Sequence, residues 1–197
     1  MLELKNIAQV LSGVSVRESK GGSARFMRLA DLSDLRAGRE PILAVGEMPA
    51  VARALTIEPG DLVVGARGST TDVCLGSEPI FGAFVSVDLY LVRPDQTRVN
   101  PQYLVAFLEL PATQVLLSTG KQGSGLARLA KDALETLQIS LPPLDHQQMI
   151  ACLAQAFNQE DRLLRKLSEL NSIFGREAMA RAIRLADTNH DFTRNIR

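Results

Sequence analysis

Hydrophobic periodicity changes most clearly in the last third of this chain of 197 residues, on either side of a double proline. Apolar and polar residues alternate from residue 137 to residue 141, which is the period of a half-buried strand. Pro142 and Pro143 remove two backbone donors, so this strand must end there. Asp145 is then placed as the N-cap of a long helix, and Gln148 completes a capping box three residues later.

The helix predicted for residues 144–187 carries a heptad repeat of apolar residues. Its a and d positions are predicted to form a dimerisation seam: Ile150, Leu153, Phe157, Leu164, Leu167, Asn171 and Phe174. A single helix with this pattern would leave an apolar stripe in water, so we expect a second copy of the chain or another subunit to cover it. Asn171 either fixes the register of the pair or is a chance polar residue near the end of the seam. Gly175 allows a bend, and the pattern leaves parallel and antiparallel pairing open.

Residues 1–143 have the pattern of a compact domain, with short apolar runs between turn signals. We expect strands at residues 26–30, 54–57, 62–64 and 83–92, helices at residues 101–110 and 112–118, and an exposed flexible loop at residues 120–125. Asn100 is predicted to cap the first helix. The order of elements lacks a regular strand–helix–strand alternation, which favours an α+β fold with a mixed β-sheet. The predicted organisation is a domain of residues 1–143, a long coiled-coil-like helix of residues 144–187 and a disordered tail of residues 188–197.

Composition narrows the possible functions. Lys plus Arg and Asp plus Glu both number 22, so the formal net charge is zero, whereas a non-specific polyanion binder usually has a basic excess. Any contact with nucleic acid must therefore come from local patches or from a basic partner subunit. Cys74 and Cys152 lie among apolar neighbours and are predicted to be buried free thiols in a reducing compartment. The sequence has neither a signal-peptide pattern nor an apolar run of about 20 residues, so we expect a cytoplasmic protein without a membrane span.

The sequence lacks the motifs that mark common enzymes. It has no phosphate-binding GxxxxGK[ST] loop, no GxGxxG motif after a strand, no nucleophile elbow and no HExxH motif. His146 and His190 cannot combine with the two cysteines at a recognised zinc spacing. We therefore expect no catalytic residue, no metal ion and no cofactor in this chain.

Three short polar segments are candidates for contact with DNA. They supply the candidate site residues Arg17, Lys20, Arg67, Ser69, Thr70, Lys121, Gln122, Ser124 and Arg128. After the strand predicted at residues 62–64, an arginine offers a forked donor, a glycine lets a phosphate approach and hydroxyl groups can donate. From residue 121 to residue 128, a glutamine could bind adenine, and the cations could bind guanine or phosphate. Each segment also has a purely structural alternative, as a strand-end turn, a solvated linker or a charged surface loop.

Taken in order along the chain, these segments resemble the specificity (S) subunits of Type I restriction–modification systems. The resemblance is carried by Leu4–Val10 with Ser12-Gly13, Arg28–Leu32, Ile57–Val64 with Arg67-Gly68, Asn100–Leu104, Gly123-Ser124, and Leu134–Leu144 followed by Gln147 and Ile150-Ala151. The last part, Leu-Pro-Pro-Leu-x-x-Gln-x-x-Ile-Ala, is the most specific, and His146 stands where the family usually has glutamate. The resemblance spans about residues 2–175 and matches one target-recognition domain with its following conserved helix.

The resemblance implies a non-catalytic subunit that recognises a DNA sequence and docks methyltransferase (M) subunits, which flip the target base. Restriction (R) subunits join such complexes for cleavage. A full S subunit has two recognition domains, so this sequence resembles a half-subunit whose homodimer would recognise a bipartite site on double-stranded DNA. Because partner subunits in the family clamp the DNA, the chain alone is expected to bind DNA weakly. The alternative is an assembly protein that keeps the fold and binds a protein partner without recognising DNA.

Overall fold

The computed structural model describes residues 1–19, 21–50, 54–123 and 127–194, from residue 186 onward as backbone only. The chain divides into two compact units, Met1–Ala154 and Gln155–Arg197. Strands and short helices make up the first unit, and the second continues one long helix, α5 (Leu144–Arg194). This is the predicted α+β class, with mixed strand pairing and a long C-terminal helix.

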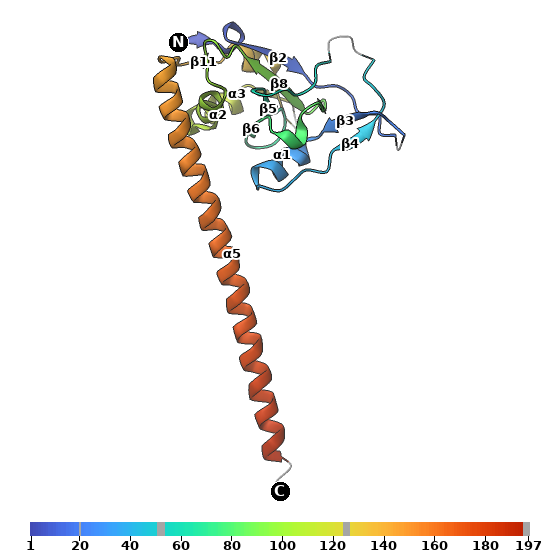
Figure 1. The fold of residues 1–197 in the computed structure, drawn as a ribbon, viewed down its shortest axis with the longest axis vertical. Helices are drawn as coiled ribbons and strands as arrows, with labels where there is room; N and C mark the ends of the chain where they lie inside the picture. The colour runs from blue at the N-terminus through green and yellow to red at the C-terminus, as the bar shows by residue number, and fades with distance from the viewer. Residues whose placement is uncertain (20, 51–53, 124–126, 195–197) are drawn as a thin grey trace. The chain divides into compact units, whose positions relative to one another are not determined.

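The centre of the first unit is a four-stranded antiparallel sheet with the order β2–β8–β5–β6 (Figure 1). Its strands are β2 (Ala8–Ser12), β8 (Leu89–Pro94), β5 (Leu62–Gly65) and β6 (Val73–Leu75). Every residue of β5 is buried because both faces of this sheet are covered. Leu62 and Val64 therefore pack in a core cluster on one face, while Val63 packs in a separate cluster on the other.

Four short helices supply the covering layers. Residues of α2 (Pro101–Glu109), α3 (Pro111–Thr119) and α4 (Lys131–Glu135) join the cluster of Leu62 and Val64. Residues of α1 (Leu29–Arg36) join the cluster of Val63. Asn100 caps α2 as predicted, because its side-chain oxygen accepts the backbone N–H groups of Gln102 and Tyr103.

The described residues of the unit also form three smaller sheets. One has the order β4–β3–β7, in which β3 (Ala24–Met27) pairs antiparallel with β4 (Ala44–Gly46) and parallel with β7 (Phe84–Val85). The other two are antiparallel pairs, β1 (Leu2–Glu3) with β11 (Gln138–Ile139), and β9 (Lys121–Gln122) with β10 (Arg128–Leu129). Two 3-10 turns, η1 (Leu4–Asn6) and η2 (Glu78–Ile80), follow β1 and β6.

Several strand predictions were wrong in detail. The strand predicted at residues 26–30 ends at Met27, and α1 begins at Leu29, because the Asp31 carboxylate accepts the Arg28 backbone N–H at 2.6 Å and starts a helix. Residues 54–57 form no strand. Residues 83–92 divide between β7 and β8, which belong to different sheets, because the chain turns where the Leu89 N–H donates to the Ser86 carbonyl. The described part of the loop predicted at residues 120–125 includes β9.

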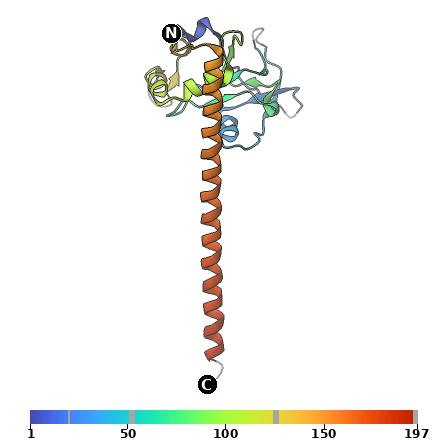
Figure 2. The same ribbon diagram turned by 60° about the vertical axis from the view of Figure 1, so that its left-hand side comes forward.

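α5 begins at the predicted residue but differs from its prediction in the cap and at its C-terminal end. The Pro143 carbonyl accepts the Gln147 N–H, so the helix begins at Leu144 and Asp145 lies inside its first turn instead of capping it. The bounds of α5 include Gly175 and reach Arg194, into the segment predicted as a disordered tail. Both views draw α5 as one helix without a break (Figure 1, Figure 2). Its Cys152 is exposed, contrary to prediction. Cys74 lies among apolar side chains as predicted, and burial raises the pKa of its thiol to about 12.

Gln147 fastens the first turn of α5 inside the first unit. This side chain is 1% exposed, and its amide makes three hydrogen bonds. Its oxygen accepts the Asn100 N–H at 2.8 Å, and its nitrogen donates to the carbonyls of Pro142 and Arg98 at 2.8 and 3.2 Å. Ala151, one turn further along, is buried in the core cluster. The glutamine of the Leu-Pro-Pro-Leu-x-x-Gln-x-x-Ile-Ala segment therefore has a structural role.

Asp61, which follows the turn before β5, pairs with Arg93 on the neighbouring strand β8. Its carboxylate accepts two hydrogen bonds from the guanidinium, at 2.7 and 2.8 Å, and one from the Glu58 N–H at 2.8 Å. The carboxylate is 2% exposed and the Arg93 side chain is 26% exposed. These hydrogen bonds raise the pKa of Arg93. Gly60 precedes the pair at a φ of +90°, a conformation that favours glycine.

Replacing Asp61 with alanine should lower the free energy of unfolding by about 2–3 kcal/mol, because it removes the two shortest carboxylate hydrogen bonds of a guanidinium that is only 26% exposed. Urea denaturation followed by circular dichroism measures this change. Glu58→Gln is the matched control, since Glu58 is 59% exposed and lies 3.3 Å from the same guanidinium. That control should change stability by less than about 0.5 kcal/mol. Equal losses in the two variants would contradict the assigned role of Asp61.

Candidate nucleic-acid interface

Two of the predicted DNA-contact segments meet in the structure. The turn after β5 contains Arg67, Ser69 and Thr70, and the β9–β10 hairpin contains Lys121, Gln122 and Arg128. The Leu129 N–H donates to the Ala66 carbonyl at 2.8 Å, and the backbones of Arg67 and Arg128 form an antiparallel bridge. These contacts join segments more than 50 residues apart, so we call the turn of residues 67–70 and the described part of the hairpin the joined loops.

Each cation of the joined loops has a partner within the chain. The Arg67 Nε donates to the Asp88 carboxylate. The backbone carbonyl of Asp88 also accepts the Ala66 N–H. The Arg67 and Asp88 side chains are about one third exposed, at 33% and 37%. An exposed pair of this kind adds little stability, so its main effect is to hold the guanidinium in one orientation.

Arg128 lies over an aromatic ring. Its guanidinium carbon is 5.3 Å from the ring centroid of Tyr90, a buried residue of β8. The same tyrosine donates its hydroxyl hydrogen to the Leu129 carbonyl at 2.7 Å. Tyr90 therefore supports β10 at two successive residues, through a cation–π contact and a hydrogen bond.

The far end of the turn is fixed by Gln114 of α3. Its side-chain oxygen accepts the Thr71 N–H at 3.0 Å, and its nitrogen donates to the Thr71 carbonyl at 2.9 Å and to the Leu108 carbonyl at 2.8 Å. Gly68 has a φ of +105°, which lets the chain turn sharply before this clamp. Sequence reasoning missed Gln114, Asp88 and Tyr90, because each acts on a segment distant in sequence and none belongs to a local motif.

The side chains that the joined loops expose are mostly uncharged. Ser69, Thr70 and Gln122 are exposed, whereas Arg67, Lys121 and Arg128 are partly buried. Burial lowers the pKa of Lys121, and the nearby charge of Asp72 acts in the opposite direction. The surface thus presents hydroxyl and amide groups with cations beside them, which are groups that can contact bases and phosphates.

The third predicted segment lies elsewhere. Arg17 is exposed, and its backbone carbonyl accepts the Glu47 N–H at 3.1 Å, so it lies beside the three-stranded sheet near the end of β4. Lys20 and Ser124, the remaining candidates, lie outside the described residues. The structure therefore brings together the described candidates of two segments and assigns Arg17 to a different part of the unit.

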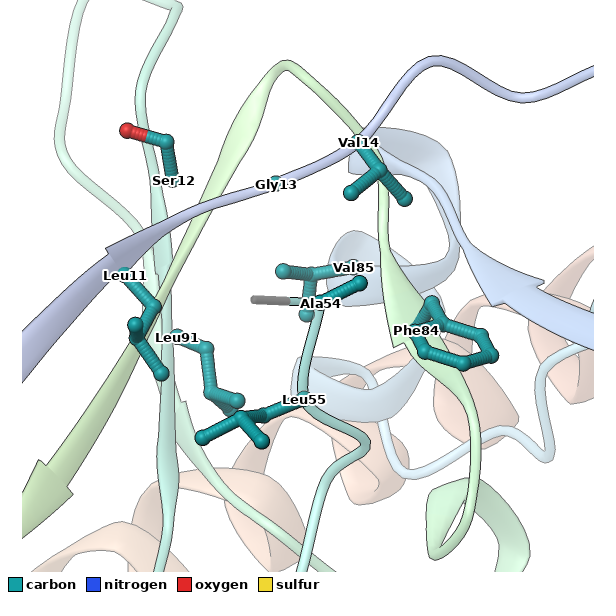
Figure 3. Close-up of a pocket in the computed structure, with 9 residues that line it drawn as sticks. All are labelled: Leu11, Ser12, Gly13, Val14, Ala54, Leu55, Phe84, Val85 and Leu91. Atoms are coloured by element: carbon teal, nitrogen blue, oxygen red, sulfur yellow. The ribbon is translucent and has the colours of Figure 1, made fainter. Parts of the chain in front are cut away.

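Other kinds of site have little support. A small cavity between β2 and β7 is lined by Leu11–Val14, Ala54-Leu55, Phe84-Val85 and Leu91, and its described lining has no ionisable side chain (Figure 3). Among the residues that the structure describes, no three His, Cys, Asp or Glu side chains gather closely enough to hold a metal ion. None of the helices in that part of the chain combines the length and apolar character required to span a membrane.

The predicted seam of α5 is exposed along its length in the single chain. Exposed fractions range from 42% for Ile150 to 76% for Phe174. The set includes Leu153, Phe157, Leu164 and Leu167, together with Leu163, Leu170 and Ile173 beside them. An apolar stripe of this length is typical of a helix that packs against a partner.

Comparison with known families gives a clear result. A model of the Type I restriction modification DNA specificity domain matches residues 46–171, which is more than half of the chain. This chain belongs to that family. The matched segment of the specificity domain begins at β4 and continues to Asn171 of α5, so it contains both the turn after β5 and the hairpin. No curated protein sequence matches the chain.

Solved structures with the same fold include three from Type I restriction–modification systems. The S subunit from M. genitalium is 14% identical with a TM-score of 0.55, and the match covers 86% of this chain and 41% of that one. A chain from a study of assembly and conformational transition of the type I R-M system has 19% identity, a TM-score of 0.61 and coverages of 84% and 40%. The HsdS subunit from Thermoanaerobacter tengcongensis has 20% identity, a TM-score of 0.57 and coverages of 85% and 38%. The specificity domain described here thus spans about two fifths of each of these chains.

Proposed function

We propose that this chain is the DNA-recognition component of a Type I restriction–modification complex and performs no catalysis itself. The observation that carries the proposal is the surface of the joined loops, which backbone contacts hold together, in a chain that belongs to the specificity domain family. Recognition of DNA would place the chain in the cytoplasm. Docked methyltransferase (M) subunits would supply the chemistry, and restriction (R) subunits would join for cleavage.

The proposed contacts divide into two kinds. Gln122 is exposed and can bind adenine through both atoms of its amide, while Ser69 and Thr70 can donate to phosphates. Arg67 and Arg128 offer guanidinium groups that suit guanine or phosphate. Because the net charge is zero, most of the sequence-independent phosphate affinity would come from the partner subunits.

We further propose that two copies of the chain pair through α5. The exposed apolar seam supports this pairing, since burying it in a second copy removes apolar surface from water in both chains. Two-fold symmetry would relate the two recognition domains. Such a dimer would recognise a bipartite site whose halves are inverted repeats.

The polar residues of the seam favour antiparallel pairing. Glu160 and Arg181 occupy d positions, so a parallel pair in register would place each of them against the same charge in its partner. In antiparallel pairs, a positions face d positions. One such register sets Glu160 opposite Asn171, and the same register sets Phe157 opposite Phe174. The continuity of α5 past Gly175 keeps all of these residues on one stripe.

Replacing both Arg67 and Gln122 with alanine should weaken sequence-selective DNA binding by about tenfold or more, because each base contact contributes about 1–3 kcal/mol. The measurement uses the chain together with its methyltransferase subunit, on a duplex selected from a random pool by the unaltered complex. Arg39→Ala is the control, since Arg39 is an exposed cation on the segment after α1 that pairs with Asp34.

An unchanged selectivity in the double variant, with the complex still assembled, would reject DNA recognition by the joined loops. It would favour the alternative function, in which the chain assembles its partners without recognising DNA.

Antiparallel pairing should give a distinctive pattern of disulfide cross-links in a Cys152→Ser background, where the remaining Cys74 thiol is partly buried in the first unit. A mixture of Phe157→Cys and Phe174→Cys chains should cross-link on oxidation, since the proposed register sets these positions opposite each other. Either variant alone should not, because the same residue in the two copies would be about 25 Å apart, far beyond the reach of a disulfide. Non-reducing electrophoresis reads out the result. Cross-linking of each variant with itself would indicate a parallel pair and reject the antiparallel register.

A further inference from the structure

The register of the β9–β10 hairpin separates Lys121 from the other candidates. Lys121 pairs with Leu129, and Gln122 pairs with Arg128. Cross-strand partners share a face of the hairpin. Leu129 is fully buried, so the Lys121 side chain leaves β9 on the buried face, whereas Gln122 is exposed on the opposite face.

From that face the Lys121 ammonium reaches the backbone of the turn after β5. Its Nζ donates to the Gly68 carbonyl at 2.8 Å and to the Ser69 carbonyl at 3.2 Å. An ammonium group has three donors, so two of the three are directed at this turn. The positive φ of Gly68 shapes the turn at the point where these carbonyls are presented.

We propose that Lys121 is a positioning residue for DNA recognition rather than a phosphate ligand, and that its ammonium fastens the turn of residues 67–70 to the hairpin. The inference rests on the proposed DNA-recognition function and deepens it, because it distinguishes the residues that touch DNA from one that holds them in place. The backbone contacts of Ala66 and Arg67 tie the start of the turn to β10, and Gln114 fixes its end at Thr71. Lys121 binds Gly68 and Ser69, which lie between the start of the turn and its end at Thr71.

The electrostatics of the site agree with this role. Partial burial lowers the pKa of Lys121, which reflects an ammonium already partly removed from solvent. A phosphate ligand would instead direct its donors at the backbone of the duplex, whereas two donors of Lys121 are already directed at the turn. The carbonyl partners of Lys121 are neutral, so they compensate its desolvation without cancelling its charge.

The first test measures the turn directly, without DNA. Lys121→Met keeps the length of the side chain and removes its donors. In the full chain, this variant should speed amide hydrogen exchange at Thr71 and Leu129 by about tenfold, because these amides hold the two ends of the joined loops. Exchange at Leu62 and Val92, in the central sheet, should stay unchanged. Lys5→Met, which removes an exposed lysine paired with Glu3, is the matched control and should leave all four amides as they are.

The second test measures how DNA binding depends on salt. The chain together with its methyltransferase subunit is titrated with the duplex selected by the unaltered complex at several KCl concentrations, and the slope of log affinity against log salt is compared between variants. Each lost phosphate contact lowers the magnitude of that slope by about 0.9. Lys121→Met should weaken binding and leave the slope unchanged.

The outcomes separate the two proposals. A slope reduced by about 0.9 in Lys121→Met would overturn the positioning role and make Lys121 a phosphate ligand. Unchanged exchange at Thr71 and Leu129 would also overturn it. If the unaltered chain and its complex bound no duplex at all, DNA recognition would fail, and the exchange experiment would still decide whether Lys121 fastens the turn.

Discussion

The apolar stripe of α5 is the constraint on which the architecture of this chain depends. Water penalises exposed apolar surface in proportion to its area, and this helix exposes leucine, isoleucine and phenylalanine side chains from Ile150 to Phe174. Only the first turns of the helix, which contain Gln147 and Ala151, pack in the core of the first unit. The remaining seam requires a partner. In the proposed dimer that requirement couples folding to assembly, and assembly brings together the two recognition domains that a bipartite DNA site needs.

The joined loops show how a chain of zero net charge can carry specificity while leaving affinity to its partners. The guanidinium of Arg67 is oriented by Asp88, and that of Arg128 lies over Tyr90, so these cations are held in fixed geometry instead of moving freely in solvent. Fixed donors suit the discrimination of bases, which depends on direction. Non-specific attraction to the duplex depends on the number of phosphate contacts, and a neutral chain contributes little to it.

Local signals in the sequence predicted local structure well. The Asn100 cap, the double proline before α5 and the apolar run of β5 all act within a few residues, and each was confirmed. Two local predictions failed, since Asp145 does not cap α5 and Asp31 starts a helix within the strand predicted at residues 26–30. The other failures lie where a distant segment decides the outcome. Residues 83–92 divide into two strands because their two ends pair in different sheets. The hydrophobic pattern of these ten residues does not indicate where one strand ends and the next begins. The meeting of the turn after β5 with the β9–β10 hairpin was not predicted either, since it depends on the backbone bond between Ala66 and Leu129. The family resemblance located both segments without indicating that they touch.

The most direct test of the account is the molar mass of the unaltered chain in solution. Light scattering at about 10 μM should give twice the chain mass of 21.4 kDa, and Leu164→Asp should return the mass to that of one chain by placing a charge in the middle of the seam. A monomer at tens of micromolar, or a Leu164→Asp variant that pairs as well as the unaltered chain, would contradict the claim that α5 is covered by a second copy.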